Sequence, residues 1–430
     1  MERYERYKDS GVKWIGEIPE HWEVLSLKFI FKLRKQLVGK ESNKYKLLSL
    51  TLQGVILRDM DNPMGKFPSS FDNYQVVEPG NFIFCNFDNE ETPRAVGMSY
   101  HRGMITGAYD VFTVYNNEMD SRFLLYYCLY IDDAKRFKPL YKGLRKTVPF
   151  DSFMSYKIPV PPKSEQTAIA NYLDSVTSKI DEAISQQRKM IDLLNERKQI
   201  IIQNAVTKGL DPNAKMKDSG VEWIGEIPED WEVKKLNSIG DFSKGANISR
   251  NQLNIEGDCL AILYGDIYTK YNIRAFDIKN RITRKTASNS VRIFKGDILM
   301  TGSGETKEDI GKTIYFENEE AYIGGDIILF RQRQVNGLFL TYALNSFYAK
   351  AFRYKESKGE IVVHIYSNAL KNIRIALPPN DAQQKIVDFL NDIFVNIGKT
   401  ISNCNKMISL LQERKQIIIN DVVTGKVKVV

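Results

Sequence analysis

The sequence predicts an α+β chain with an internal pseudo-two-fold duplication, in which two globular domains are joined by two long helices that form an antiparallel coiled coil. Three observations support this prediction. A segment rich in tryptophan occurs twice, a helical segment that begins at two prolines occurs twice, and the residues between these copies differ in the two halves. Self-similarity at a fixed offset indicates a structural unit that is used more than once.

The first repeat is KDSGVKWIGEIPEHWEV, which begins at Lys8 and returns as KDSGVEWIGEIPEDWEV at Lys217. The copies contain every tryptophan of the chain, namely Trp14, Trp22, Trp223 and Trp231. The surface that this segment covers is therefore needed twice.

The second repeat begins IPVPPKSEQ at Ile158 and IALPPNDAQQ at Ile375. The paired prolines cannot continue a helix, and Ser164 and Asp381 after them are good N-cap residues, so each copy predicts a helix start. Spacings of four and three then alternate along each helix, which predicts a coiled-coil seam. In the first helix the seam is Ile169, Leu173, Val176, Ile180, Ala183, Gln187, Met190, Leu194, Arg197 and Ile201. In the second it is Ile386, Leu390, Ile393, Ile397, Thr400, Cys404, Met407, Leu411, Arg414 and Ile418.

Each helix of about 43 residues would be roughly 64 Å long, too long for the interior of a small domain. A duplicated chain that closes about a pseudo-two-fold axis makes the two helices antiparallel and places the inserts at opposite ends. We call the tryptophan-containing repeat and the helical repeat the frame repeats, and together the frame. The predicted domains are 1–157 (first globular domain with its tryptophan-containing frame repeat), 158–210 (first helix and linker), 211–374 (second globular domain with its tryptophan-containing frame repeat) and 375–430 (second helix).

The inserts, about residues 25–157 and 234–374, show little resemblance to each other and are rich in strand-like runs such as NFIFCNF, DVFTVY and DIILF. The same scaffold therefore carries two different domains.

Composition limits the class of protein. The chain has 430 residues, a net charge of +8 and 43% hydrophobic residues, which is typical of a globular protein with a polyanionic partner. No apolar run reaches the roughly 18 residues of a membrane span, and the opening MERYERYKDS does not resemble a secretory signal, so we expect a cytoplasmic protein. The cysteines and histidines are scattered, which argues against a disulfide framework or a zinc site.

Motifs for catalysis are weak. TKEDIGKT, from Thr306, ends like a phosphate-binding loop but lacks its first glycine. Asp297, Glu305 and Lys307 imitate the acidic cluster of a Mg²⁺-dependent nuclease, but their spacing is short. We predict that the chain catalyses nothing by itself and binds no metal. A self-contained nuclease is one alternative, and a coiled-coil assembly protein without DNA binding is another.

The two repeats resemble a known family. SGVEWIGEIPEDWEV, the LPP-x-x-x-Q segment that starts at Leu377, IPVPPKSEQ and the helix ends LLxERKQIII are similar to the specificity subunit of type I restriction-modification systems. The similarity covers both frame repeats, and the duplicated layout covers the whole chain.

The resemblance implies that each insert is a target recognition domain that reads one half of a bipartite, asymmetric DNA site, while the helices set the spacing between the halves. Two dissimilar inserts suit two different half-sites. The implied partners are double-stranded DNA, two methyltransferase subunits and restriction/translocase subunits. The implied cofactors, S-adenosylmethionine, ATP and Mg²⁺, belong to these partners, and no cofactor is expected in this chain.

Candidate DNA contacts are basic and polar residues of the insert loops, where solvated loop surface is the simpler alternative. In the first domain they are Arg94, Arg102, Lys142, Arg145 and Lys146, and in the second Arg250, Tyr264, Ser303, Lys307 and Lys358. The family places a glycine-containing basic loop shortly before the second repeat. YKGLRKTV fits this pattern better than SKGEIVVH, in which Glu360 stands where a cation is expected.

Candidate partner-binding residues lie in the repeats: the four tryptophans, with Arg197 and Arg414 on the helices. We expect the indoles to pack where each recognition domain meets a helix, and a patch that faces a methyltransferase is the alternative.

Overall fold

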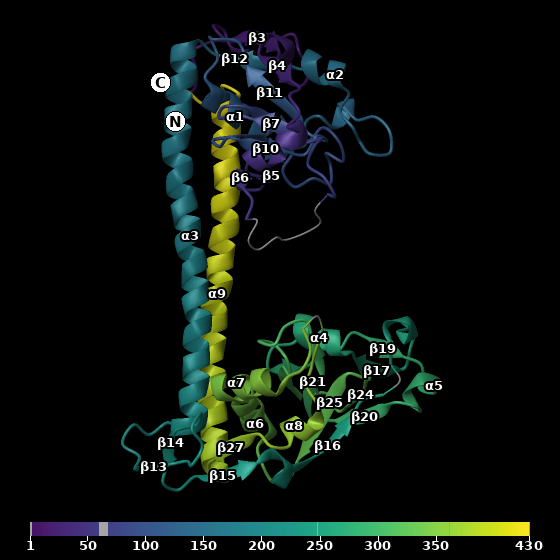
Figure 1. The fold of residues 1–430 in the computed structure, drawn as a ribbon. Coiled ribbons are helices and arrows are strands. Elements are labelled where there is room, and N and C mark those ends of the chain that lie inside the picture. The colour runs from purple at the N-terminus through teal and green to yellow at the C-terminus, as the bar shows by residue number, and fades with distance from the viewer. Residues whose placement is uncertain (1, 60–67, 247, 361, 430) are drawn as a thin grey trace. The chain divides into compact units, whose positions relative to one another are not determined.

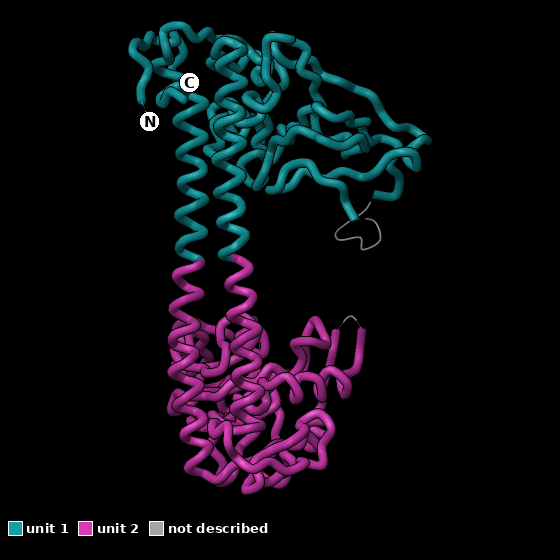
Figure 2. The backbone as a smooth tube through the Cα atoms, turned by 90° about the vertical axis from the view of Figure 1, so that its left-hand side faces the viewer, with its two compact units in different colours: residues 1–187, 405–430 teal, residues 188–404 magenta. Residues whose placement is uncertain are grey.

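The computed structural model describes residues 2–59, 68–246, 248–360 and 362–429. The chain forms two compact units, residues 1–187 with 405–430 and residues 188–404 (Figure 2). Each unit contains one insert and part of both long helices, α3 (Lys163–Lys208) and α9 (Asn380–Val423) (Figure 1). The four predicted domains follow the order of the chain, whereas the compact units divide both helices, so the predicted domain boundaries stay a prediction.

Unit 1 is built on short strands. These are β1 (Tyr7–Asp9), β2 (Glu17–Pro19), β3 (Glu23–Ser26), β4 (Phe31–Arg34), β5 (Leu48–Thr51), β6 (Gly54–Leu57), β7 (Gln75–Val77), β8 (Phe82–Phe84), β9 (Val96–Met98), β10 (Gly103–Ile105), β11 (Asp110–Val114) and β12 (Lys157–Val160). Its shorter helices are η1 (Leu27–Phe29), η2 (Gly39–Lys44), α1 (Ser121–Asp133), η3 (Lys138–Leu140) and α2 (Phe150–Ser155). The central antiparallel sheet has the order β4-β11-β8-β9. Phe84 packs edge-on against Phe31 and Phe112 of the same sheet and against Phe153 of α2.

Unit 2 has larger sheets. Its strands are β13 (Met216–Asp218), β14 (Glu226–Pro228), β15 (Glu232–Lys235), β16 (Gly240–Lys244), β17 (Cys259–Ile262), β18 (Arg274–Ala275), β19 (Arg281–Ile282), β20 (Val291–Phe294), β21 (Ile298–Thr301), β22 (Ser303–Gly304), β23 (Thr313–Phe316), β24 (Glu320–Ile323), β25 (Ile327–Gln332), β26 (Val363–His364) and β27 (Arg374–Leu377). The helices are η4 (Leu236–Ser238), η5 (Arg250–Gln252), α4 (Tyr264–Thr269), α5 (Arg284–Ala287), α6 (Gly337–Leu344), α7 (Phe347–Glu356) and α8 (Ser367–Leu370). The main sheets have the orders β16-β25-β21-β23-β18 and β19-β17-β24-β20.

The two frame repeats pair with each other in each unit. β3 pairs antiparallel with β12 in unit 1, and β15 pairs with β27 in unit 2. The registers are equivalent, because Glu23 lies opposite Val160 and Glu232 lies opposite Leu377. The two ends of each insert therefore meet at one strand pair, although the inserts themselves fold differently.

A buried glutamine explains the proline-proline-glutamine pattern of the second repeat. The Gln166 side chain donates to the carbonyl of Pro161 (2.9 Å) and accepts from the backbone N–H of Asp120 (2.9 Å), the N-cap of α1. Gln383 makes the same two bonds in unit 2, to Pro378 (2.9 Å) and Asn336 (2.8 Å). Gln166 therefore ties the start of α3 to the start of α1, and Gln383 ties the start of α9 to the start of α6.

The long helices run antiparallel within each unit, as predicted. In unit 1, Ile169 and Leu173 share a core with Ile419 and Val422, and further along Lys415 bonds to Asp181. In unit 2, Ile202 and Val206 share a core with Ile386 and Leu390, while Lys198 lies over the ring of Phe394 (4.4 Å to its centroid).

The predicted seam is correct at its buried residues Ile169, Leu173, Ile180, Ile386, Leu390, Ile397 and Cys404, but at other positions it is shifted by one residue. In α3 the better-buried residues are Ile184, Ile191 and Lys198, in place of the predicted Ala183, Met190 and Arg197. In α9 they are Ile401, Ile408 and Lys415, in place of Thr400, Met407 and Arg414. Both spacings keep to one face of a helix with 3.6 residues per turn, so the position of the neighbouring helix decides between them.

The shifted seam places a lysine at the same position of both helices, with different partners. Lys415 bonds to Asp181 at 2.6 Å. By the offset of 217 between the copies, the position opposite Lys198 is Gly398, where an added Cβ would meet no atom of the described chain within 4 Å. Burial, and after it the charge of Lys350, lowers the pKa of Lys198.

We predict that Gly398→Asp stabilises unit 2 by recreating the ion pair of unit 1. Replacing a helical glycine by aspartate contributes only about 0.3 kcal/mol, because aspartate is itself a poor helix former, and a partly exposed ion pair adds about 0.2 to 1 kcal/mol. Gly398→Ala is the control for helix propensity. In a double-mutant cycle of thermal unfolding with Lys198→Met, a coupling energy of zero between positions 198 and 398 would contradict the prediction.

Candidate nucleic-acid and partner interfaces

The predicted glycine-containing loop occurs in both units and is closed in the same way. In unit 1 the backbone of Lys142 pairs with that of Thr147 (2.9 and 3.0 Å), and in unit 2 Lys358 pairs with His364 (2.9 and 2.8 Å). Gly143 and Gly359 follow the lysines with φ of +68° and +103°, a conformation that other residues rarely adopt. The two loops are structural counterparts, even though their tips differ in sequence.

Acidic side chains hold the cations of the unit 1 loop. Arg145 bonds to Asp88 (2.7 Å), and Lys146 bonds to Glu90 (2.5 Å) and Glu91 (3.3 Å). Hydrogen bonds from Lys146, and then from Lys138, lower the pKa of Glu90 to about 2. We call residues 88–91 the acidic turn. A DNA phosphate that bound this loop would compete with these carboxylates.

The remaining candidates of unit 1 differ in accessibility. The side chain of Arg94 is only 16% exposed and bonds to Asp132 (3.3 Å) and Asp133 (2.8 Å), which ties the segment before β9 to the end of α1. Its role as a DNA contact stays a prediction that this geometry does not favour. Arg102 is exposed beside Glu78 (3.3 Å), and Lys142 is exposed at the base of the loop.

In unit 2, Ser303 supports the loop instead of lying on the surface. It is buried, its Oγ lies 2.9 Å from Nδ1 of His364, and its strand β22 pairs with β26. The structure thus brings Ser303 and Lys358 together on opposite sides of His364, with only Lys358 exposed. Direct contact of Ser303 with DNA is not favoured by this burial.

The other unit 2 candidates lie on different elements. Arg250 begins η5, and one of its guanidinium nitrogens would be 3.7 Å from a Cβ at Gly265, so Arg250 lies beside the start of α4. Tyr264, the first residue of α4, is about half exposed, and Lys307 is partly exposed in the loop after β22.

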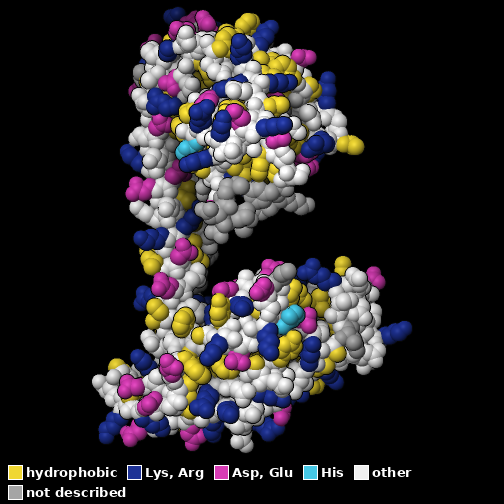
Figure 3. Space-filling model, viewed as in Figure 1, with side chains coloured by type: hydrophobic (Ala, Val, Ile, Leu, Met, Phe, Trp, Pro, Cys, Tyr) yellow, Lys and Arg dark blue, Asp and Glu magenta, His cyan; other side chains and the backbone are white. Residues whose placement is uncertain are grey.

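The nuclease-like pattern has a structural explanation. Asp297 is buried and accepts two hydrogen bonds from Arg331 (2.8 and 2.6 Å) and one from the backbone of Phe294 (2.9 Å). Among the residues that the structure describes, no group of three or more His, Cys, Asp or Glu side chains is arranged to hold a metal ion. On the face shown in Figure 3, Lys and Arg side chains alternate with Asp and Glu on both units.

The two tryptophans of each frame repeat have different surroundings. Trp22 and Trp231 are buried. Gly425 follows α9 and Gly209 follows α3, both with positive φ, and a Cβ there would lie 3.1 and 3.2 Å from the respective indoles. These indoles therefore pack on the C-terminal ends of the long helices. Trp22 also donates to Glu165 of α3 (3.2 Å).

Trp14 and Trp223 are about half exposed. Trp14 stacks on Tyr156, with centroids 5.2 Å apart, and donates to the carbonyl of Lys157 (3.3 Å). Trp223 lies 6.1 Å from Phe352. Only these outer indoles offer an accessible surface to a partner.

Each long helix also carries an exposed apolar stripe beside the seam. The stripe residues are Met190, Leu193 and Ile200 on α3 and Met407, Leu410 and Ile417 on α9, and all are 47–53% exposed. The two sets are equivalent at the offset of 217, and Arg197 and Arg414 stand at the matching position within each. Sequence reasoning assigned both methionines to the seam and so missed the stripes, although two parallel apolar series in each helix were the available signal.

Exposed apolar residues at spacings of three, seven and ten positions share one face of a helix and are typical of an interaction surface. Together, the duplicated frame and the two unlike inserts define a class of protein: a scaffold in which two equivalent strand pairs and helix starts carry two different globular domains.

The comparisons give this class a family. The model of the type I restriction modification DNA specificity domain matches residues 106–190 and 228–404, which is more than half of the chain. The chain belongs to this family. It is the specificity subunit of a type I restriction-modification system, and not a self-contained nuclease or an assembly protein without DNA binding.

Individual relatives agree with this assignment. A putative type I restriction enzyme specificity subunit, MjaX, from Methanocaldococcus jannaschii is 26% identical over 98% of both chains. A putative specificity subunit from Haemophilus influenzae is 24% identical over 75% of this chain and 77% of the relative. A solved structure described under complex assembly and conformational transition of the type I restriction-modification system has the same fold, with a TM-score of 0.69 at 15% identity, and the match covers 95% of this chain and 99% of that one.

Within the described parts of the chain, no helix combines the length and the apolar character that crossing a membrane requires.

We predict that Glu90→Gln strengthens sequence-independent DNA binding, because it removes the carboxylate that pairs with Lys138 and one of the two carboxylates that pair with Lys146. Each additional phosphate contact should steepen the dependence of log K on log salt concentration by about 0.9. Since the pKa of Glu90 is about 2, this carboxylate is ionised between pH 5 and 8, and the effect should not change over that range.

The matched control is Glu41→Gln. Glu41 bonds to Lys44 at 2.7 Å elsewhere in unit 1, so the substitution changes the net charge equally. Equal shifts of the salt dependence for the two variants, measured by fluorescence anisotropy with random-sequence duplex, would show that the acidic turn has no special role.

Proposed function

We propose that this specificity subunit recognises a bipartite, asymmetric DNA site, with each insert reading one half. The observation that carries the proposal is the pairing of two unlike inserts with two equivalent frames, which share strand register and the buried glutamine. One scaffold that presents two different surfaces suits two different sequences. The two long helices would set the number of unspecified base pairs between the half-sites.

The proposed partners are two copies of a methyltransferase subunit. Two equivalent stripes support this stoichiometry, because each offers the same apolar residues and an arginine at the same spacing. Restriction/translocase subunits would join the methyltransferase complex. S-adenosylmethionine, ATP and Mg²⁺ would act in these partners, and the assembly would modify or cut DNA in the cytoplasm.

Mapping methylated adenine in a host that expresses this chain with its methyltransferase tests the DNA site. We expect a single motif of two defined parts separated by a fixed number of unspecified bases. Exchanging residues 234–374 for the corresponding insert of another member should change one part of the motif and leave the other. Methylation at a continuous motif, or at no motif, would overturn the proposal.

Substitutions in the stripes test the partner stoichiometry. We predict that Leu193→Glu and Leu410→Glu each leave one bound methyltransferase copy, while the double variant binds none. Each leucine is about half exposed, at 50% and 49%, and glutamate is a good helix former, so the fold should persist. The two single variants are matched controls for each other.

Native mass spectrometry of the purified complex gives the number of bound copies, and circular dichroism checks the helices. Two copies bound to the double variant, with the helices intact, would contradict docking on the stripes.

A further inference from the structure

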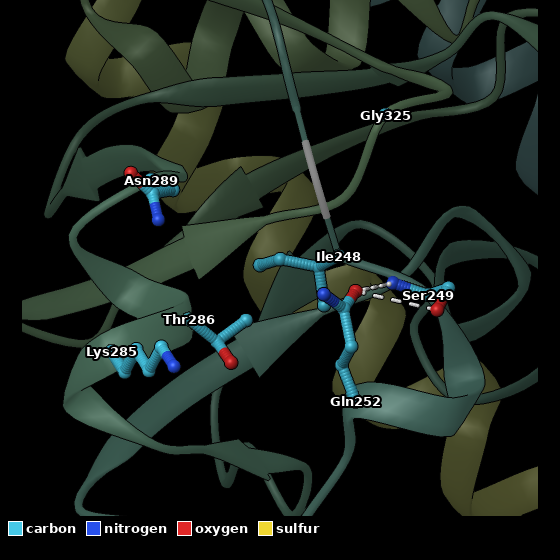
Figure 4. Close-up of a pocket in the computed structure, with 7 residues that line it drawn as sticks. All are labelled: Ile248, Ser249, Gln252, Lys285, Thr286, Asn289 and Gly325. Atoms are coloured by element: carbon cyan, nitrogen blue, oxygen red, sulfur yellow. Dashed lines mark hydrogen bonds between the residues drawn. The ribbon is translucent and has the colours of Figure 1, made fainter.

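A pocket on unit 2 lies between η5 and α5, away from the residues assigned above except Arg250 (Figure 4). Its volume is about 540 Å³. Polar side chains and one open glycine line it: Ser249, Gln252, Lys285, Thr286, Asn289 and Gly325.

The walls of the pocket are fixed by a separate small core. Ile248 of one wall and Ala287 of the other are buried together with Ala261 and Ile282 of strands β17 and β19. An added Cβ at Gly325 would meet no described atom within 4 Å, so a ligand can approach the backbone there closely. The hollow is therefore a built feature of the domain and not a gap between loose loops.

The orientation of the Gln252 amide is determined by its neighbour. The backbone N–H of Ser249 can only donate, and it lies 2.8 Å from Oε1 of Gln252, which must therefore be the acceptor oxygen. The amide NH₂ then points away from Ser249, towards the middle of the pocket (Figure 4). Gln252 thus presents a hydrogen-bond donor to any ligand.

The opposite wall presents a cation. Lys285 is exposed on α5, and Thr286 beside it carries a hydroxyl group. No carboxylate is among the described residues that line the pocket. The neighbouring Arg284 bonds instead to Asp258 (3.2 Å). Donors on two walls and one positive charge favour a ligand that only accepts hydrogen bonds and is negatively charged.

We propose that this pocket holds a phosphate group of the DNA backbone and so fixes the position of the second recognition domain on its half-site. Phosphates project from a duplex whereas base edges lie recessed in its grooves, so a hollow on the protein suits a phosphate and a projecting loop suits a base. Lysine, serine, threonine, asparagine and glutamine are the usual phosphate contacts. The proposal rests on the DNA recognition proposed above and adds a site that sets register without reading sequence.

Three substitutions that each lower the net charge by one test the site. Lys285→Ala removes the cation. Gln252→Glu keeps an oxygen for the Ser249 N–H but turns a carboxylate oxygen into the pocket. Arg284→Ala, one residue from Lys285, is the control because its ion pair with Asp258 lies outside the lining.

DNA binding of the full chain with its methyltransferase is measured against salt concentration, with the mapped motif and with a random duplex. For Lys285→Ala we expect affinity for both duplexes to fall by the same factor, roughly five- to tenfold near 0.1 M salt, with a salt slope lower by about 0.9. Gln252→Glu should weaken both at least as much. Equal effects of Arg284→Ala and Lys285→Ala would overturn the proposal, since they would indicate only long-range charge.

The source of the phosphate is tested separately. Ethylation of backbone phosphates should identify one position that weakens binding of the unchanged protein but not of Lys285→Ala. Displacement of DNA from the pocket by millimolar inorganic phosphate or a mononucleotide, without such a position, would indicate a site for a free phosphate compound and would overturn the proposal. If the unchanged complex showed no preference for any sequence, the proposed function would fail, whereas a sequence preference with unaffected variants would reject the pocket alone.

Discussion

The fold depends on a buried glutamine at the start of each long helix. Gln166 and Gln383 each donate a hydrogen bond to a proline carbonyl just before the helix. Each also accepts a hydrogen bond from the backbone N–H of the residue that caps α1 or α6. An apolar residue of similar size would leave both buried polar groups without a partner, at a cost of about 1 to 3 kcal/mol each. Together with the adjacent strand pair, this contact fixes the direction in which an insert leaves its helix.

This arrangement separates the part of the chain that must be repeated from the part that is free to differ. The strand pairs β3–β12 and β15–β27 keep one register, and the inserts between them fold into sheets of different size and order. The two units also differ within the frame, because Lys415 has Asp181 as a partner while Lys198 lies on Phe394 opposite a glycine. The duplication therefore preserves the fold of the frame but not the arrangement of its charged side chains.

The sequence predicts the duplicated architecture well because the repeats are long and the helix starts carry specific residues. It predicts individual sites less well. The sequence predicts Arg94 and Ser303 to be DNA contacts in loops. In the structure, however, Arg94 bonds to Asp132 and Ser303 bonds to His364, and both partners are distant in sequence. The acidic turn was missed for the same reason, since only the fold brings Glu90 beside Lys146. Along the helices, neighbouring apolar residues such as Met190 and Ile191 left the seam position undetermined.

The placement of the tryptophans gives the protein a spectroscopic property. All four lie in the frame, so tryptophan fluorescence, excited selectively over tyrosine, reports on the frame and not on the inserts. The enclosed indoles, Trp22 and Trp231, should emit at shorter wavelength than the half-exposed Trp14 and Trp223. Quenching by iodide would address only the latter pair, which allows contact at the outer surface of the frame to be followed without an added dye.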